Sequence, residues 1–339
     1  MAILPLVSRP EAWQALCVRT QASQTVRDQK KTAPVRRAGL AAWICLLIVY
    51  LVWGSTYLAI RVGVETMPPL LMAAARQLVA GLIMFPLAIR SRRAAVRAGR
   101  IERLWPSRAE WLGCAIVGIL LLVANGVVGV GEKTVPSGLA ALLVATVPLW
   151  LLGIDAGLNH ARIGLAPLAG LLLGLAGVAL LSGLGGDSHG TSVTGVLIIL
   201  AAAAAWALGT IMAGRVTIPS SAALASGMEL LVGGAALLVL SASTGEFSSL
   251  HLSAVSTRSW LALGYLIVFG SIVAFSAYGI AVRDLPTATV ATYAYVNPVI
   301  AVLLGALILN ERLTPATIAG GVLIVGAVFL VVRRRPPAH

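Results

Sequence analysis

The second half of this 339-residue chain repeats the first half. Pro136 and Pro148 stand twelve residues apart in an apolar run, and Pro286 and Pro298 repeat that spacing 150 residues later. A fixed period of this kind indicates two copies of one structural unit. Further pairs match at this offset or at 153: Ala141 and Ala291, Arg162 and Arg312, Gly170 and Gly320, Val178 and Val328, Trp53 and Trp206, Gly81 and Gly234.

The composition predicts that both copies lie in a membrane. Hydrophobic residues make up 59% of the chain and charged residues 11%, against about 25% charged in soluble domains. A soluble fold of this size could not bury so much apolar surface, so lipid must cover much of it. The net charge of +13 does not point to nucleic acid, because the basic residues lie beside apolar segments, where membrane orientation explains them.

The apolar runs predict an all-α membrane protein with ten transmembrane helices and no separate soluble domain. The expected spans are 40–60, 70–90, 111–131, 137–156, 163–183, 194–214, 222–242, 259–280, 287–309 and 315–332. The predicted domains are a basic, disordered cytoplasmic tail at 1–39, five-helix repeats at 40–185 and 190–332, and a basic cytoplasmic C-terminus at 333–339. Since five is odd, the second repeat enters the bilayer from the opposite side, so the two repeats are inverted.

The basic residues predict which side of the membrane each segment occupies. With both ends of the chain inside, most of the 25 Lys and Arg residues fall on the cytoplasmic side, including those in 90–108 and the cluster Arg333–Arg335. This distribution obeys the positive-inside rule. We therefore expect a multi-pass protein of the plasma (inner) membrane with both termini cytoplasmic.

Charged residues inside the spans are the first candidates for a transport site, because each is costly in a bilayer. Arg76 and Glu229 fall at equivalent positions of the two repeats, and each could serve as a gate charge or substrate counter-ion. Interfacial snorkelling or structural pairing is the alternative. Glu132, at the end of the third span, could carry protons or hold an amine, but a helix cap or a local pair with Lys133 would explain it more simply.

Polar and aromatic side chains near mid-span are the second group of candidates. They would suit a cavity for amphipathic solutes, since a Tyr or Trp presents an apolar face and one hydrogen-bonding tip. Hydrogen bonding between helices would explain them equally well. Pro148 and Pro298 predict kinks in the fourth and ninth spans. The cavity or gating set is Trp53, Tyr57, Arg76, Asn125, Glu132, Trp206, Glu229, Tyr278, Tyr293, Tyr295 and Asn297.

Enzymatic chemistry has little support in the sequence. The four His residues lie in loops or in the tail, without paired spacing, and no close acidic pair marks a catalytic centre. Three widely spaced Cys residues provide neither a disulfide framework nor a metal site. We expect no catalytic residues, no metal and no cofactor.

Several motifs, taken in order, resemble the EamA-like family of the drug/metabolite transporter superfamily. They are Trp53–Tyr57, Asn125-Gly126 with Glu132, Thr134–Leu143, Asn297-Pro298 and Asn310–Thr314. Within the family, the run Val135–Leu143 is similar to the YedA-like subgroup. The resemblance covers about residues 40–332 and implies ten helices, an inverted five-plus-five repeat, and export of small metabolites, amino acids or drugs. The chain departs from the pattern at Ala161, which stands where Glu311 stands in the second half, and at Glu229.

The repeat and the resemblance together predict a secondary transporter that exports small solutes by alternating access around a site between the halves. Proton exchange, substrate exchange and facilitated diffusion all stay open, with Glu132 and Glu229 as candidate proton sites. The alternatives are a nucleotide-sugar or phosphosugar exchanger, which should need more inward-facing cations than Arg76, and a non-transporting membrane scaffold. The expected partners are a small-molecule substrate and the lipid bilayer, without nucleic acid; a homodimer stays open.

Overall fold

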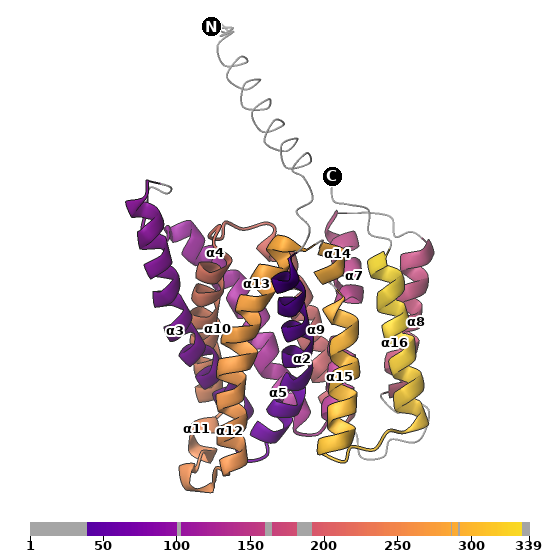
Figure 1. Cartoon of the computed structure of the whole chain (residues 1–339). Coiled ribbons are helices and arrows are strands. Elements are labelled where there is room, and N and C mark those ends of the chain that lie inside the picture. Colours follow the sequence, from indigo (N-terminus) through magenta and orange to yellow (C-terminus); the bar gives the residue numbers. More distant parts are fainter. Residues whose placement is uncertain are drawn as a thin grey trace, which may run out of the picture. The chain divides into compact units, whose positions relative to one another are not determined.

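The computed structural model describes residues 39–99, 103–159, 165–181, 192–285, 287–290 and 292–333, and these are helices joined by turns and short loops, without a strand (Figure 1). The predicted tail lies outside this part except for Gly39, and the predicted C-terminal segment except for Arg333. The helices are α2 (Leu40–Gly63), α3 (Pro69–Arg97), α4 (Arg108–Gly118), η1 (Ile119–Val123), α5 (Ala124–Glu132), α6 (Ser137–Val144), α7 (Val147–Asn159), α8 (Leu165–Leu181), α9 (Val193–Ala213), α10 (Ala222–Ser243), α11 (Glu246–Ser249), η2 (Leu252–Ala254), α12 (Thr257–Tyr265), η3 (Leu266–Val273), α13 (Ala274–Asp284), α14 (Thr287–Val290), α15 (Tyr293–Ile308) and α16 (Pro315–Arg333).

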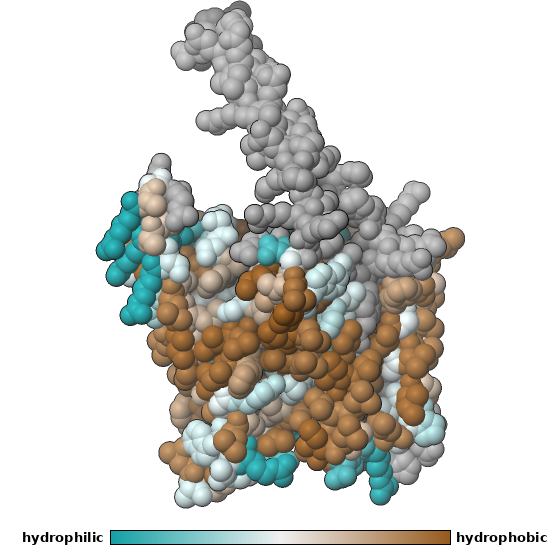
Figure 2. Space-filling view, in the orientation of Figure 1, coloured by the Kyte–Doolittle hydropathy of each residue, from teal (hydrophilic) through white to brown (hydrophobic). Residues whose placement is uncertain are grey.

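Seven helical stretches in the described part are long and apolar enough to cross a membrane, where the sequence predicts ten. They are Leu40–Gly63, Pro69–Arg97, Arg108–Glu132, Ser137–Leu158, Val193–Ala213, Ala222–Ser243 and Thr257–Ala281. The other three predicted spans contain shorter apolar helices, at Leu168–Leu180, Val296–Ile308 and Pro315–Leu330. Hydrophobic residues form a broad belt on the face in Figure 2, and hydrophilic residues gather toward its upper and lower edges. This is the surface expected of a multi-pass membrane protein.

Helices α3 and α10, which the repeat predicts to be equivalent, pack against each other through reciprocal contacts. A Cβ atom added to Gly81 would lie 2.9 Å from the backbone nitrogen of Leu231. A Cβ atom added to Gly234 would lie 2.9 Å from the backbone nitrogen of Leu78. Both Gly81/Gly234 and Leu78/Leu231 differ by 153 residues, so one contact is the counterpart of the other with the halves exchanged. Small residues permit this close approach of two helices.

The same exchange relates α8 and α16. A Cβ atom at Gly174 would lie 3.4 Å from the Cβ of Ala327, and one at Gly177 would lie 2.8 Å from Ile324. Adding 150 to Gly174 and Gly177 gives Ile324 and Ala327, so this pair of contacts is also reciprocal. Both helix pairs therefore fit a two-repeat architecture in which equivalent helices of the two halves meet.

Two helices contain π-helical segments that the sequence analysis did not predict. Segment η1 lies between α4 and α5, and η3 lies between α12 and α13, at about the same place in each half. A π-helical turn holds one extra residue and often occurs at functional sites. The matching positions show that the repeat extends to local irregularities of the backbone.

The two prolines predicted to kink helices occupy different settings. The fourth span is interrupted by a turn at Ala145 and Thr146, and Pro148 is the second residue of α7. It therefore stands in the first turn of a helix, where a missing N–H costs nothing, rather than inside a continuous helix as predicted. Pro298 does lie inside α15, as predicted.

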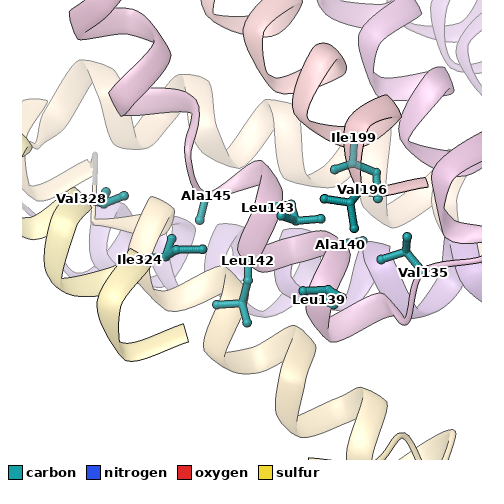
Figure 3. Packing of buried hydrophobic residues seen from close by; sticks show 10 residues of the cluster. All are labelled: Val135, Leu139, Ala140, Leu142, Leu143, Ala145, Val196, Ile199, Ile324 and Val328. Atoms are coloured by element: carbon teal, nitrogen blue, oxygen red, sulfur yellow. The ribbon is translucent and has the colours of Figure 1, made fainter. Parts of the chain in front are cut away.

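A hydrophobic cluster holds parts of both halves together. In Figure 3, side chains of α6, from Leu139 to Leu143, lie between Val196 and Ile199 of α9 and Ile324 and Val328 of α16. Six of the ten cluster members, including Leu143, Ile199 and Ile324, have no exposed surface. Below, the end of the bundle where α2 begins is called the Leu40 end, and the end where α2 finishes is called the Gly63 end; the latter lies lower in Figure 1.

Candidate functional site

Arg76 of α3 lies at the centre of a polar network inside the bundle. Its side chain is 5% exposed. The Nε atom donates to the hydroxyl of Ser271 in η3 at 3.0 Å, and Nη1 donates to the Oδ1 of Asn125 in α5 at 3.2 Å. Gln77 donates from Nε2 to the same oxygen at 3.3 Å. The network therefore joins α3 and α5 of the first half to η3 of the second half.

Gly270 makes room for the Arg76 guanidinium. A Cβ atom at position 270 would lie 3.4 Å from Nη2 of Arg76 and 3.1 Å from the methyl group of Thr56. The backbone oxygen of Gly270 also accepts a hydrogen bond from the indole nitrogen of Trp53 at 3.3 Å. The π-helical segment η3 thus contributes Ser271 to Arg76 and a carbonyl to Trp53 from adjacent residues.

Glu132, the last residue of α5, is fully buried and its carboxylate has no hydrogen-bond partner. The charges of Glu311, Arg61 and Arg76 act on it. Arg61 donates to the backbone oxygen of Glu132 rather than to its side chain. Lys133 is exposed and forms no ion pair with it, so the local pair considered from the sequence is not found. An ionised carboxylate buried without a partner is costly, and a bound cation or proton would complete such a site.

Three of the predicted aromatic residues form one cluster. The ring of Trp53 in α2 lies 5.2 Å from that of Tyr278 in α13 and 5.3 Å from that of Tyr293 in α15, centroid to centroid. Tyr278 and Tyr293 are 6.0 Å apart in an edge-to-face arrangement. Phe275 adds an edge contact to Trp53 at 5.5 Å. Because Trp53 donates a hydrogen bond to Gly270, which also lies against Arg76, the aromatic cluster adjoins the Arg76 network.

Asn297 belongs to α15, like Tyr293, and is 7% exposed. With its amide oriented to satisfy its neighbours, its nitrogen donates to the backbone oxygens of Tyr50 and Tyr293, each at 3.3 Å. The Tyr50 hydroxyl is hydrogen-bonded to Thr292. Asn297 therefore ties α15 to α2, which agrees with the interhelical alternative considered for it.

The remaining candidates fall in two places. Tyr57 and Trp206 each pack against a cluster formed by Ala124 and Val128 of α5 and Ala202 of α9. Glu229 is half-buried in α10, and its backbone lies against Gly118 at the end of α4. No hydrogen bond joins Glu229 to Arg76 in the described residues. The side chain of Tyr295 lies outside the part that the structure describes.

Sequence reasoning missed two members of the Arg76 network and one separate contact made by Glu311. Gln77 donates to Asn125 and Ser271 accepts from Arg76, yet neither carries a charge that would distinguish it in an apolar run. Glu311 was noted only as part of a motif. Its carboxylate accepts hydrogen bonds from the backbone N–H of Ser137 at 2.7 Å, the hydroxyl of Ser137 at 2.8 Å and the N–H of Gly138 at 3.1 Å. No cluster of metal-ligating side chains is found among the described residues.

Comparisons with known proteins agree with this architecture. Residues 40–183 and 193–333 each match the EamA-like transporter family. The chain belongs to the EamA-like transporter family. It is 39% identical over 291 residues to the inner membrane transporter YedA of Escherichia coli (strain K12), which covers 84% of this chain and 89% of the relative.

Two other similarities are more distant. The chain is 28% identical over 300 residues to a probable amino-acid metabolite efflux pump of Escherichia coli (strain K12), over 85% of this chain and 93% of that protein. A solved structure titled only as a crystal structure of a protein superposes with a TM-score of 0.54 at 23% identity, over 85% of this chain and 95% of the other. At that identity the superposition supports the fold alone. Family membership and the apolar helices together identify a multi-pass membrane protein of a transporter family.

Proposed function

We propose that this protein is a secondary transporter that exports small amphipathic solutes, such as amino acids, amines or related metabolites, by alternating access. Its ten spans would form two inverted five-helix repeats at 40–185 and 190–332, with both termini in the cytoplasm. The three shorter apolar helices would complete the ten spans, with α14 and α15 together making the ninth.

The observation that carries this proposal is the pair of buried, opposite charges in a membrane bundle. Arg76 is held by neutral partners, and the Glu132 carboxylate has none. Ionisable residues inside membrane spans mark substrate or ion pathways by default. A solute with an ammonium group, or a proton, would supply what Glu132 lacks. The adjoining ring cluster of Trp53, Tyr278 and Tyr293 offers apolar faces to the rest of such a solute.

The backbone supports the same location. The fourth span is divided into α6 and α7, and the ninth into α14 and α15; the two breaks lie about one helical turn apart under the 150-residue offset. Discontinuous helices in both repeats are typical of binding sites in secondary transporters. The reciprocal packing of α3 on α10 and of α8 on α16 supports the inverted arrangement, because equivalent helices meet across one axis.

The described residues favour this reading over the nucleotide-sugar or phosphosugar exchanger. Arg76 is the buried basic side chain of the network, whereas Arg61, near the end of α2, donates to the backbone oxygen of Glu132. A phosphorylated solute carries about two negative charges and is usually held by several Lys or Arg residues. The scaffold alternative gives no reason for a buried carboxylate without a partner.

Purified protein in liposomes provides the test. Labelled amino acids, amines and nucleotides would be loaded, and their release followed with and without a pH gradient. We expect release of an amine or amino acid, and at least a tenfold loss with Arg76→Gln, because the substitution removes a buried charge from the network. Release of nucleotides alone would favour the exchanger. Absence of flux for every class would contradict the proposal.

A further inference from the structure

The Glu311 contact crosses between the two halves of the protein. Glu311 lies in the loop between α15 and α16, and it binds the first two residues of α6, Ser137 and Gly138, which belong to the first half. The carboxylate satisfies N–H groups that a helix leaves unpaired at its N-terminus, and the helix dipole favours its negative charge. Ser137 is fully buried and Glu311 is half-buried, so these bonds are partly shielded from water.

The local backbone is shaped to deliver this carboxylate. Asn310 adopts a left-handed conformation, with φ of 53°, and the N–H of Glu311 donates back to the oxygen of Gly305 at 3.1 Å. Gly138 also allows α6 to approach α15, because a Cβ atom there would lie 2.9 Å from the Cα of Val302. The contact therefore closes a seam between α6 and α15 at the Gly63 end.

The matching seam at the Leu40 end lacks these features. Subtracting 150 from Val302 and Glu311 gives Leu152 and Ala161, and adding 150 to Gly138 gives Ala288. The methyl side chain of alanine cannot accept the hydrogen bonds that the glutamate carboxylate accepts. Within the described residues, α7 does not pack against α14 or α15 as α6 packs against α15. Among the described residues, the packing between the fourth and ninth spans is therefore concentrated at the Gly63 end.

A second glutamate provides a comparison at the same end. The Glu246 carboxylate accepts from the N–H groups of Leu70 and Leu71 at 3.2 and 2.8 Å, so it also joins the second half to a first-half helix N-terminus. The seam it spans, between α3 and α10, is closed along its length by the contacts at Gly81, Gly227 and Gly234. Losing the Glu246 cap should therefore not open that seam.

We propose that Glu311 is the gate residue of the transport cycle. Its carboxylate, bound to the N-terminus of α6, holds the Gly63 end closed and must release α6 whenever the protein opens at that end. The gate role rests on the proposed transport function, and the location of the Gly63 end at the outer face rests on the proposed topology. Position 161 carries alanine rather than an acid, so the first repeat has no side-chain counterpart of Glu311 at that position.

The test uses a cysteine reporter in the seam. Cys17, Cys45 and Cys114 are replaced by alanine, and Val302→Cys is added in protein reconstituted in liposomes. A membrane-impermeant thiol reagent is then applied to one face at a time. We expect Glu311→Ala to raise the labelling rate from the outer face about tenfold, which corresponds to about 1.4 kcal/mol. Glu246→Ala, the matched control, should leave the rate unchanged.

Two milder variants keep the test decisive if Glu311→Ala does not fold. Glu311→Gln and Ser137→Ala each weaken the contact, and both should raise the labelling rate by a smaller factor. Unchanged rates in the folded variants, or an equal rise with Glu246→Ala, would overturn the gate. Labelling needs no substrate, so a rise without detectable flux would leave the gate standing and count against the transport proposal. A rise seen only from the other face would contradict the topology.

Discussion

At the scale of single residues, Glu132 is the group whose setting a structural role explains least. It is fully buried, its carboxylate makes no hydrogen bond, and the exposed Lys133 beside it does not pair with it. A residue kept only for packing would be better replaced by an apolar side chain, since an unpaired buried charge is costly. Arg76 differs, because Ser271 and Asn125 accept hydrogen bonds from its Nε and Nη1 atoms.

Replacing Glu132 with glutamine separates a transport role from a structural one. The substitution removes a charge but no hydrogen bond of the carboxylate, so we expect the thermal unfolding midpoint in detergent to stay the same or rise. We expect flux in liposomes to fall at least tenfold, because the buried charge is the group that a cation or proton would meet. Lys133→Gln is the control and should change neither quantity. Unaltered flux in Glu132→Gln would remove Glu132 from the mechanism.

At the scale of helices, glycine contacts set how the two halves meet. The sequence predicts equivalence of Gly81 and Gly234 from their spacing alone. The structure adds that each lies against the partner helix at the counterpart leucine, Leu231 or Leu78. Without a hydrophobic drive for association in lipid, such close backbone approach is a main source of helix–helix stability.

Gly81→Ala tests this packing against a matched substitution. The new Cβ atom would lie 2.9 Å from the Leu231 backbone, so α10 must move, and we expect a loss of about 1–3 kcal/mol of stability. Gly279→Ala in α13 meets no atom within 4 Å and should be neutral or stabilise by up to about 1 kcal/mol. Thermal unfolding of both variants in the same detergent gives the comparison. Equal midpoints would show that the α3–α10 contact does not limit stability.

At the scale of the whole molecule, the central question is how the bundle lies in the bilayer. The apolar belt and the family identify a membrane protein, and the basic segments, such as the C-terminal turns of α3, predict its orientation. An inverted repeat requires an odd number of spans in each half and an even total.

Reporter fusions at the two ends of the chain measure that orientation. A reporter that is active only in the cytoplasm should give signal at both the N-terminus and the C-terminus, and a reporter that is active only outside should give none. Fusions after residue 133, at the predicted outer end of the third span, should show the reverse pattern. Opposite locations of the two termini would contradict the ten-span architecture.

The sequence by itself determined the membrane class, the two-copy organisation and the family, because composition, spacing and motif order are properties of the chain alone. It also identified Arg76, Asn125 and Trp53 as interior polar groups, since polar residues stand out in apolar runs. Its prediction of a kink at Pro148 was wrong, because the chain turns at Ala145 and Thr146 and Pro148 stands in the first turn of the next helix.

Only the tertiary structure decided which of these groups meet. Arg76 binds Ser271, 195 positions away, and Glu311 caps a helix 174 positions away. Such contacts depend on how helices pack and on the extra turn residues of η1 and η3, which rotate side chains out of the register that a regular α-helix would give. Hydropathy and spacing describe one helix at a time, whereas a hydrogen bond depends on the relative position and rotation of two.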